Sequence, residues 1–261
     1  MSILAEHPGE GTSRLDLIQL TDVTVSFDGF KALDIGYFAV DRNALRVVIG
    51  PNGAGKTTLC DVISGKTRPA SGRVVFDEVD ITGMADTAIA ARGVGRKFQT
   101  PTVFDGLTVM ENMELALPRT RGVWRNLFAR TAPAERELIE SILTRVRLIE
   151  SRAIESRHLS HGQRQWLEIS MLMVSRPKLL LVDEPAAGLT DHETALTAEL
   201  LNELKGHHTI IVIEHDMEFV RRLGSEVTVL CEGRVLSSGT LEHVQNDAKV
   251  IEAYLGRGKE R

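Results

Sequence analysis

The segment GPNGAGKTT, residues 50–58, is the feature that most limits what this chain can fold into. It fits the pattern G-x-x-x-x-G-K-[ST], in which glycines let backbone N–H groups converge on phosphate oxygens. The apolar run LRVVIG before it predicts a strand, and a helix is expected to begin near Gly55. A strand, a glycine-rich loop and a helix N-terminus in this order predict a phosphate-binding site in an α/β fold.

Two side chains of this loop have specific expected roles toward a nucleotide. Lys56 supplies a full positive charge to the phosphates, and the Thr57 hydroxyl can hold Mg²⁺. The alternative is an accidental glycine-rich turn, but average residue frequencies give about a 1% chance of such a match in a chain of this length. The residues predicted to bind nucleotide here are Gly50, Pro51, Asn52, Gly53, Ala54, Gly55, Lys56, Thr57 and Thr58.

A second candidate element is LLLVDEP, in which four apolar residues lead into Asp183 and Glu184. In an open α/β sheet the carboxyl ends of strands face the ligand crevice. Asp183 can serve Mg²⁺ there, directly or through water, and Glu184 can polarise the water that attacks a γ-phosphate. A solvated acidic turn before Pro185 explains the pair equally well in isolation. The upstream phosphate loop favours the functional interpretation.

Apolar strands alternate with helical segments along much of the chain, which indicates a parallel sheet covered on both faces. Residues 98–173 instead show helical periods, as an insertion would. We predict a flexible tail at 1–15 and a single domain at 16–261, with an α/β core at 16–98 and 174–261 and a helical part at 99–173. Strands are expected at 23–27 and in GRVVFD, KLLLVDEP and HTIIVIEHD, with a helix in DHETALTAELLNELK, a hairpin in VTVLCEGRVLSSG turning at Glu232-Gly233, and a helix after it.

Composition narrows the context further. A formal net charge of −5 argues against a nucleic-acid partner. Cys60 and Cys231 lie far apart without metal-ligand spacing, so they are expected to be small reduced hydrophobes of a cytosolic protein. The N-terminal residues lack the pattern of a signal peptide, and no apolar run approaches the ~18 residues of a membrane span. Any membrane role is expected to come through a partner.

Three further segments are ambiguous when each is considered alone. Gln99 in GRKFQTPTVF is explained as a surface amide, and His215 in IVIEHDM as a histidine satisfied at a strand end. The segment LSHGQRQWLEIS starts a helix with no nucleophile and base beside it. In order with the phosphate loop and the acidic pair, however, these segments resemble the ATP-binding-cassette (ABC) ATPases over essentially residues 16 to 255.

The resemblance implies a P-loop NTPase core with a parallel sheet, an antiparallel β subdomain and an inserted α-helical subdomain. It also implies ATP and Mg²⁺ as ligands. Glu184 would polarise the attacking water, His215 would contact the γ-phosphate, and Gln99 would sense both the water and Mg²⁺. The metal site would then consist of Thr57, Gln99 and Asp183.

In such ATPases the signature loop caps the nucleotide held by a second subunit in a head-to-tail sandwich, and the resemblance places the GLTD segment ending at Asp191 between the two sites. The chain departs from the common pattern by having His161 in place of glycine and Thr190 in place of alanine. We expect activity to survive both changes, although His161 near a nucleotide would make the rate depend on pH near neutrality. The signature residues are Ser160, His161, Gly162 and Gln163.

Phe27 occupies the position where the family stacks an aromatic ring on adenine. The alternative is a core residue, because Val23, Val25 and Phe27 would share one face of a strand. Val103 and Phe104 are candidate anchors for a short helix of a membrane subunit, with packing inside the helical insertion as the alternative. The basic and aromatic stretch RGVWRNLFAR is expected to form an amphipathic surface helix, with contact to lipid headgroups as the alternative.

Within the superfamily, a single cassette without coiled-coil or zinc insertions favours an importer ATPase over a soluble translation or repair ATPase or an exporter. The segment GRKFQTPTVFDGLTVMENMELAL and the ending VIEAYLG resemble the branched-chain amino acid group of uptake ATPases. Within that group, FQTPTVF, LSHGQRQWLEIS and EHDMEFVR most closely resemble the urea and short-chain amide importers, and a branched-chain amino acid importer is the alternative. The implied partners are a second cassette in a homo- or heterodimer, two transmembrane permease subunits and an external solute-binding protein. The implied location is peripheral, on the cytoplasmic face of the inner membrane.

Overall fold

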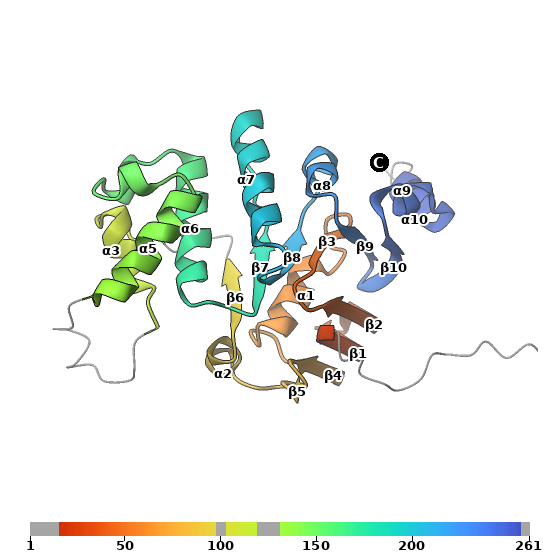
Figure 1. Cartoon of the computed structure of the whole chain (residues 1–261). Coiled ribbons are helices and arrows are strands. Elements are labelled where there is room, and N and C mark those ends of the chain that lie inside the picture. Colours follow the sequence, from red (N-terminus) through yellow and green to blue (C-terminus); the bar gives the residue numbers. More distant parts are fainter. Residues whose placement is uncertain (1–15, 98–102, 119–130, 257–261) are drawn as a thin grey trace, which may run out of the picture.

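The computed structural model describes residues 16–97, 103–118 and 131–256 (Figure 1). The predicted tail at 1–15, Gln99 and the stretch RGVWRNLFAR lie outside the described residues. No helix in the described ranges is long and apolar enough to cross a membrane.

A six-stranded sheet forms the centre of the molecule, with the order β10-β9-β3-β8-β7-β6. Neighbouring strands are parallel except for β10, which pairs antiparallel with β9. Every residue of β7 and β8 is buried, which confirms the prediction from their continuous apolar runs. The strands are β3 (Leu45–Ile49), β6 (Val94–Lys97), β7 (Leu179–Asp183), β8 (Thr209–Ile213), β9 (Glu226–Cys231) and β10 (Arg234–Gly239).

A second, antiparallel sheet of four strands has the order β2-β1-β4-β5. Its strand β2 was not predicted, and β1 begins earlier than expected. In β1 the buried positions change phase between Leu20 and Val23, around Asp22 with its φ of 51°, so the alternation that predicts a strand is interrupted. The strands are β1 (Asp16–Phe27), β2 (Phe30–Asp41), β4 (Ser71–Phe76) and β5 (Val79–Asp80).

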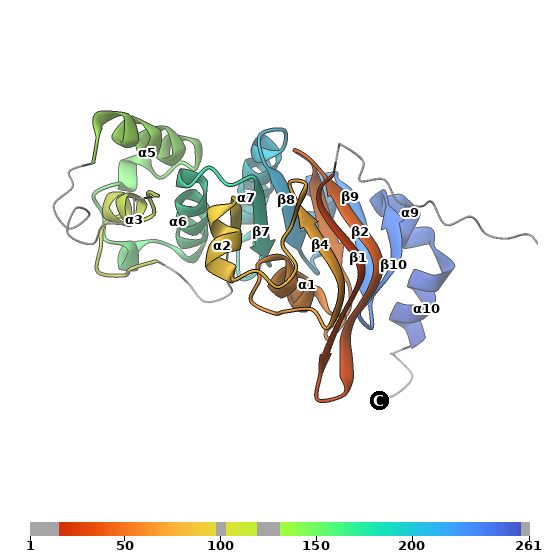
Figure 2. The ribbon, with the colours of Figure 1, turned by 90° about the horizontal axis from the view of Figure 1, so that it is seen from below.

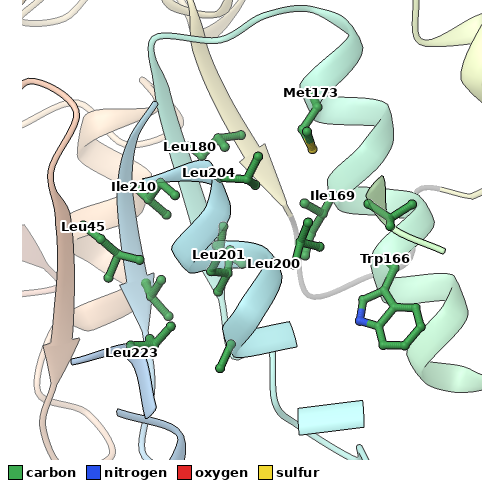
Figure 3. Packing of buried hydrophobic residues seen from close by; sticks show 14 of the residues in the cluster. Leu45, Trp166, Ile169, Met173, Leu180, Leu200, Leu201, Leu204, Ile210 and Leu223 are labelled. Carbon is green, nitrogen blue, oxygen red and sulfur yellow. The ribbon is translucent and has the colours of Figure 1, made fainter. Parts of the chain in front are cut away.

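The two faces of the central sheet belong to two different apolar cores. Leu179 and Leu181 of β7 face the antiparallel sheet and the helices α1 (Lys56–Ile63) and α2 (Asp86–Ala91). The intervening Leu180 and Val182 face the opposite core, which Figure 3 shows between β7, β8 and the helices α6 and α7. The helices on this second face include α6 (His161–Val174), α7 (Asp191–Leu204) and α8 (Met217–Leu223).

A helical block lies to one side of the sheets in both Figures 1 and 2. Its elements fall within the predicted helical insertion except for Val174, the last residue of α6, and the boundaries of the insertion stay a prediction. Thr108 and Ser160 cap α3 and α6 with reciprocal capping boxes, in which the Glu111 and Gln163 side chains complete the pairs. The block consists of α3 (Val109–Leu115), α5 (Pro133–Arg145), the 3₁₀ turns η1 (Ile149–Ser151) and η2 (Ser156–His158), and α6.

The C-terminal part differs from the prediction of one helix, because α9 (Leu241–Asn246) and α10 (Ala248–Gly256) are separate. Asp247 between them has an extended backbone, and its carboxylate accepts a hydrogen bond from Lys249 N at 2.9 Å. The predicted hairpin is present in β9 and β10. Cys60 is buried in α1, where burial raises the pKa of its thiol to about 12, so it packs as a small apolar residue.

Candidate nucleotide-binding site

The phosphate loop connects the end of β3 to the start of α1, in the predicted order. Gly50 cannot be replaced without a shift of the backbone, because a Cβ there would lie 2.2 Å from Leu230 O. Gly55 has a φ of 97° and stands at the N-cap of α1, which in the described structure has no side-chain cap and no acidic residue in its first turn. The N–H groups at this helix end are therefore available to an anion.

A turn from a distant part of the chain supports the loop. Gly233 N donates to Ala54 O at 3.0 Å, and Gly233 O accepts from Asp34 N at 2.8 Å. Gly233 has a φ of 76°, and a Cβ would lie 2.9 Å from both Ala32 O and Leu33 Cα. The sequence predicted the turn at Glu232-Gly233 but not that its backbone connects the phosphate loop to β2.

Lys56 lies folded over the loop, where its Nζ donates to Gly50 O at 2.7 Å and to Pro51 O at 3.0 Å. Burial lowers the pKa of the Lys56 ammonium, while the nearby carboxylates of Glu184 and Asp183 act in the opposite direction. The structure thus brings Lys56 close to the distant pair Asp183 and Glu184, and all three were predicted to act on phosphate chemistry.

Asp183 is the last residue of β7 and is only 4% exposed. Within the described part of the chain its Oδ1 atom is buried without a hydrogen-bond partner. Burial and the neighbouring Glu184 raise the pKa of the Asp183 carboxyl. A buried, unpartnered carboxylate oxygen on a residue close enough to interact with the Lys56 charge fits the predicted Mg²⁺ site. Mg²⁺ commonly binds one or two protein ligands together with substrate phosphates, and no cluster of three or more His, Cys, Asp or Glu ligands occurs among the described residues.

Glu184 follows Asp183 with a φ of 47°, an uncommon conformation for a residue other than glycine. Its backbone N–H donates to Ile213 O at 2.9 Å, which fixes it to the end of β8. The Glu184 Oε1 atom lies 3.5 Å from Nδ1 of His215, whose side chain is 62% exposed. The predicted base and the predicted phosphate-contacting histidine therefore stand side by side at the carboxyl end of the sheet.

Glu214, which the sequence analysis missed, is 1% exposed and lies directly before His215. Its Oε1 accepts from Ala186 N at 2.9 Å, and its Oε2 accepts from His215 N at 3.0 Å and Asp216 N at 3.3 Å. Burial raises the pKa of the Glu214 carboxyl, and the three backbone donors oppose this rise. One buried carboxylate thus holds the backbone on both sides of the candidate site.

The signature residues bond to the segment that follows Glu184. The Nε2 atom of His161 lies 3.2 Å from Ala187 O, and Gln165 Nε2 donates to the same carbonyl at 3.1 Å. Ser160, exposed at the N-cap of α6, donates through Oγ to Glu193 Oε1 at 3.1 Å. His161, the departure from the common signature, therefore packs on this segment of its own chain.

Phe27 is 51% exposed at the end of β1, opposite Phe30 in the hairpin, so the core alternative is wrong. Its stacking on adenine stays a prediction. Val103 is partly buried against the core between β7, β8 and the helices α6 and α7, whereas Phe104 is 56% exposed. Of the candidate docking anchors, only Phe104 therefore presents most of its side chain to solvent.

The chain matches two family models. Residues 34–187 match the family described as "ABC transporter", which is more than half of the chain. Residues 234–260 match the family described as "Branched-chain amino acid ATP-binding cassette transporter".

Curated relatives are similar over nearly the whole chain. The high-affinity branched-chain amino acid transport ATP-binding protein LivG of Salmonella typhimurium is 34% identical over 92% of this chain and 98% of its own length. The corresponding protein BraF of Pseudomonas aeruginosa has the same identity and coverage. The probable LivG protein of Archaeoglobus fulgidus is 33% identical over 93% of this chain and 96% of its own length.

Solved structures show the same fold. A nucleotide-free ATP-binding cassette from an ABC transporter aligns with a TM-score of 0.80 at 29% identity, covering 92% of this chain and 99% of that chain. The ADP conformation of an ATP-binding cassette of an ABC transporter aligns with a TM-score of 0.81 at 29% identity, covering 93% and 99%. The predicted fold class is confirmed by these neighbours.

Proposed function

This chain belongs to the ABC transporter family and is an ATPase, and from that premise we propose that it is the ATP-hydrolysing subunit of an importer for branched-chain amino acids. The observation that carries the ATPase chemistry is the convergence of Lys56, Asp183 and Glu184 beside the uncapped N-terminus of α1. This arrangement supports the roles of Lys56 as the cation for phosphate, Asp183 as a metal ligand and Glu184 as the base.

The cargo differs from the first expectation. Urea or short-chain amides were expected from three segments, but the relatives that match nearly the whole chain are named for branched-chain amino acid transport. The family model that covers residues 234–260 carries the same description. These findings support the branched-chain amino acid alternative and give no support to urea.

In the proposed mechanism, Lys56 exchanges its bonds to Gly50 O and Pro51 O for the phosphates of ATP, and the loop N–H groups complete the cradle. Thr57 and Asp183 would hold Mg²⁺, which neutralises charge on the phosphates when bound. Glu184, directly after the end of β7 and with a left-handed backbone, accepts a proton from the attacking water. His215 approaches the γ-phosphate from the side of Glu184, and Glu214 holds the His215 backbone in place.

Completion of the site depends on a second cassette. ATPases of this family form dimers and work with membrane permease subunits. Ser160, the Gly162 backbone and the start of α6 would cap the γ-phosphate of the other cassette, with either a second copy or a related chain as partner. A solute-binding protein outside the membrane would deliver the amino acid. The chain would lie peripherally on the cytoplasmic face of the inner membrane, where ATP drives closure by binding the closed pair better than the open one.

The cargo is tested by uptake of labelled leucine and labelled urea in cells with and without this subunit. Loss of leucine uptake alone, restored by the wild-type chain but not by Glu184→Gln, is the expected result. Loss of urea uptake alone would replace the branched-chain assignment with the amide one. Unchanged uptake of both solutes would contradict the importer assignment for either cargo.

The chemistry is tested on the purified chain. Glu184→Gln should reduce ATP hydrolysis by about 10²–10³-fold and leave ATP binding intact, because only the proton acceptor is lost. Lys56→Ala should instead weaken ATP binding itself. The exposed Glu203→Gln on α7 removes the same charge away from the site and serves as the control. A fully active Glu184→Gln would rule out its role as the base.

A further inference from the structure

The carboxylate of Glu193 has two sets of partners, one on each oxygen. Its Oε2 accepts hydrogen bonds from Thr190 N at 3.1 Å and from Thr190 Oγ1 at 2.9 Å, which completes the capping box of α7. Its Oε1 accepts the hydrogen bond from Ser160 Oγ at 3.1 Å. A single side chain therefore joins the N-terminus of α7 to the N-cap of α6.

The bond to Glu193 uses the only hydrogen that the Ser160 hydroxyl can donate. The hydroxyl oxygen already accepts from Gln163 N at 3.2 Å as the cap of α6, and a serine hydroxyl has one hydrogen to donate. In this conformation that hydrogen goes to Glu193. The donor that a phosphate would need at the signature is thus already bound to a carboxylate of the same chain.

Charge and shape both favour this internal contact. Hydrogen bonds from Thr190 and Ser160, with the nearby His161, hold the pKa of the Glu193 carboxyl below its usual range, so it remains an anion. Gly162 leaves room for it, because a Cβ at that position would lie 2.5 Å from Glu193 Oε1. A phosphate that approaches Ser160 therefore meets a like charge at the same hydroxyl.

We infer that Glu193 is a positioning residue that holds Ser160 in the unpaired cassette and must release it before Ser160 can bind the nucleotide of a partner subunit. This inference rests on the proposed function, in which the signature acts on the other cassette. Release of the hydrogen bond opposes closure, so Glu193 raises the ATP concentration that closure requires.

The test is Glu193→Gln in the transporter complex purified through a tag on this chain. Thr190 N and Thr190 Oγ1 both donate hydrogen bonds, so the side-chain oxygen of the new glutamine should turn toward Thr190. Glutamine also occurs at this position of capping boxes. The NH₂ group then faces Ser160 and cannot accept its hydrogen, so the hydroxyl is free for phosphate. We expect the ATP concentration for half-maximal hydrolysis to fall about tenfold, which corresponds to about 1.4 kcal/mol. The matched control is Glu199→Gln, which removes an exposed charge from the same helix beside Arg147.

The outcomes separate this inference from the proposed function. An ATP dependence like that of Glu199→Gln, or a higher half-maximal ATP concentration, would overturn the inference. A purely structural role of Glu193 would instead lower the melting temperature without changing the ATP dependence. Ser160→Ala should reduce hydrolysis and remove the gain from Glu193→Gln in the double variant. If Ser160→Ala leaves hydrolysis unchanged, the proposed signature role itself is wrong.

Discussion

Lys97 Nζ and Glu168 Oε2 lie 3.3 Å apart, and their side chains are only 6% and 5% exposed. Lys97 ends β6 at the edge of the central sheet, and Glu168 lies in the middle of α6, the helix that begins with the signature residues. The pair is thus a buried ionic connection between the α/β core and the helical block. Buried charges of this kind are tolerated only when each retains its partner.

Lys97→Met should destabilise the fold by about 3–5 kcal/mol, because it removes the ammonium group from beside a Glu168 carboxylate that is only 5% exposed. The double variant Lys97→Met with Glu168→Leu should recover most of this loss, since both charges are then absent. Chemical denaturation of the purified chains measures both free energies of unfolding. Equal stability of Lys97→Met and the wild type would show that the pair contributes no such connection.

Asp183→Asn should stabilise the nucleotide-free chain at neutral pH. The folded protein raises the pKa of Asp183 by burial, so the charged carboxylate costs stability as the pH rises above the unfolded value of 3.8. If removal of the charge raises the free energy of unfolding by about 1 kcal/mol, the melting temperature rises by about 2–4 °C. With Mg²⁺ and ATP present, the wild type should have the higher melting temperature, because it gains free energy from Mg²⁺ binding that the variant lacks. A variant that responds to Mg²⁺ as the wild type does would refute the metal-ligand role.

Glu214→Gln should lower kcat by about tenfold and cost about 1–3 kcal/mol of stability. An amide can keep its oxygen toward only one side, so its NH₂ group must face a backbone donor at Ala186 or at His215 and Asp216. The misplaced backbone displaces His215 relative to Glu184, while the phosphate loop and the affinity for ATP stay intact. Steady-state hydrolysis and equilibrium ATP binding, measured together, distinguish this from a loss of binding.

Gly233→Ala should weaken ATP binding by about tenfold, because its Cβ would press on β2 and disturb the bond from Gly233 N to Ala54 O. The control is Gly224→Ala at the end of α8, which also has a positive φ, of 56°, but has open space around the added Cβ. Both variants carry the backbone cost of about 1 kcal/mol for alanine in this conformation. Only Gly233→Ala should lose affinity for nucleotide, and equal affinities would disprove the supporting role of the turn.

The parts of the site that the sequence predicted are those encoded by a local pattern. The phosphate loop needs nine adjacent residues, and Asp183 is marked by four apolar residues before it. Glu214 also follows an apolar strand, but its donors come partly from Ala186, which is 28 positions away. No local sequence pattern predicts that backbone N–H groups from distant segments meet at one carboxylate. Glu193 did carry a local signal, the Thr-x-x-Glu spacing of a capping box, although that signal predicts a helix start and gives no hint of Ser160.

The fold is likewise divided into elements that a local pattern predicts and elements that it does not. Continuous apolar runs identified β3, β7 and β8 because both faces of these strands are buried. β2 was missed since its buried positions change phase between Ile35 and Phe38, as they do in its partner β1. In an irregular strand pair, the alternation of buried and exposed residues can be recognised only when the pairing of the strands is known.

The bond between Gly233 and the phosphate loop also limits how this protein can be recombined with its relatives. The chain from Arg234 onward starts directly after that turn, and Arg234 bonds to Asp34 Oδ2 through Nε at 3.0 Å and Nη2 at 2.8 Å. A chimaera that exchanges its C-terminal segment at this point keeps Gly233 but takes residue 234, and with it the bonds that tie the turn to β2, from the other parent. Grafts intended to alter only the C-terminal helices should be joined after Gly239, so that the hairpin remains from the original parent.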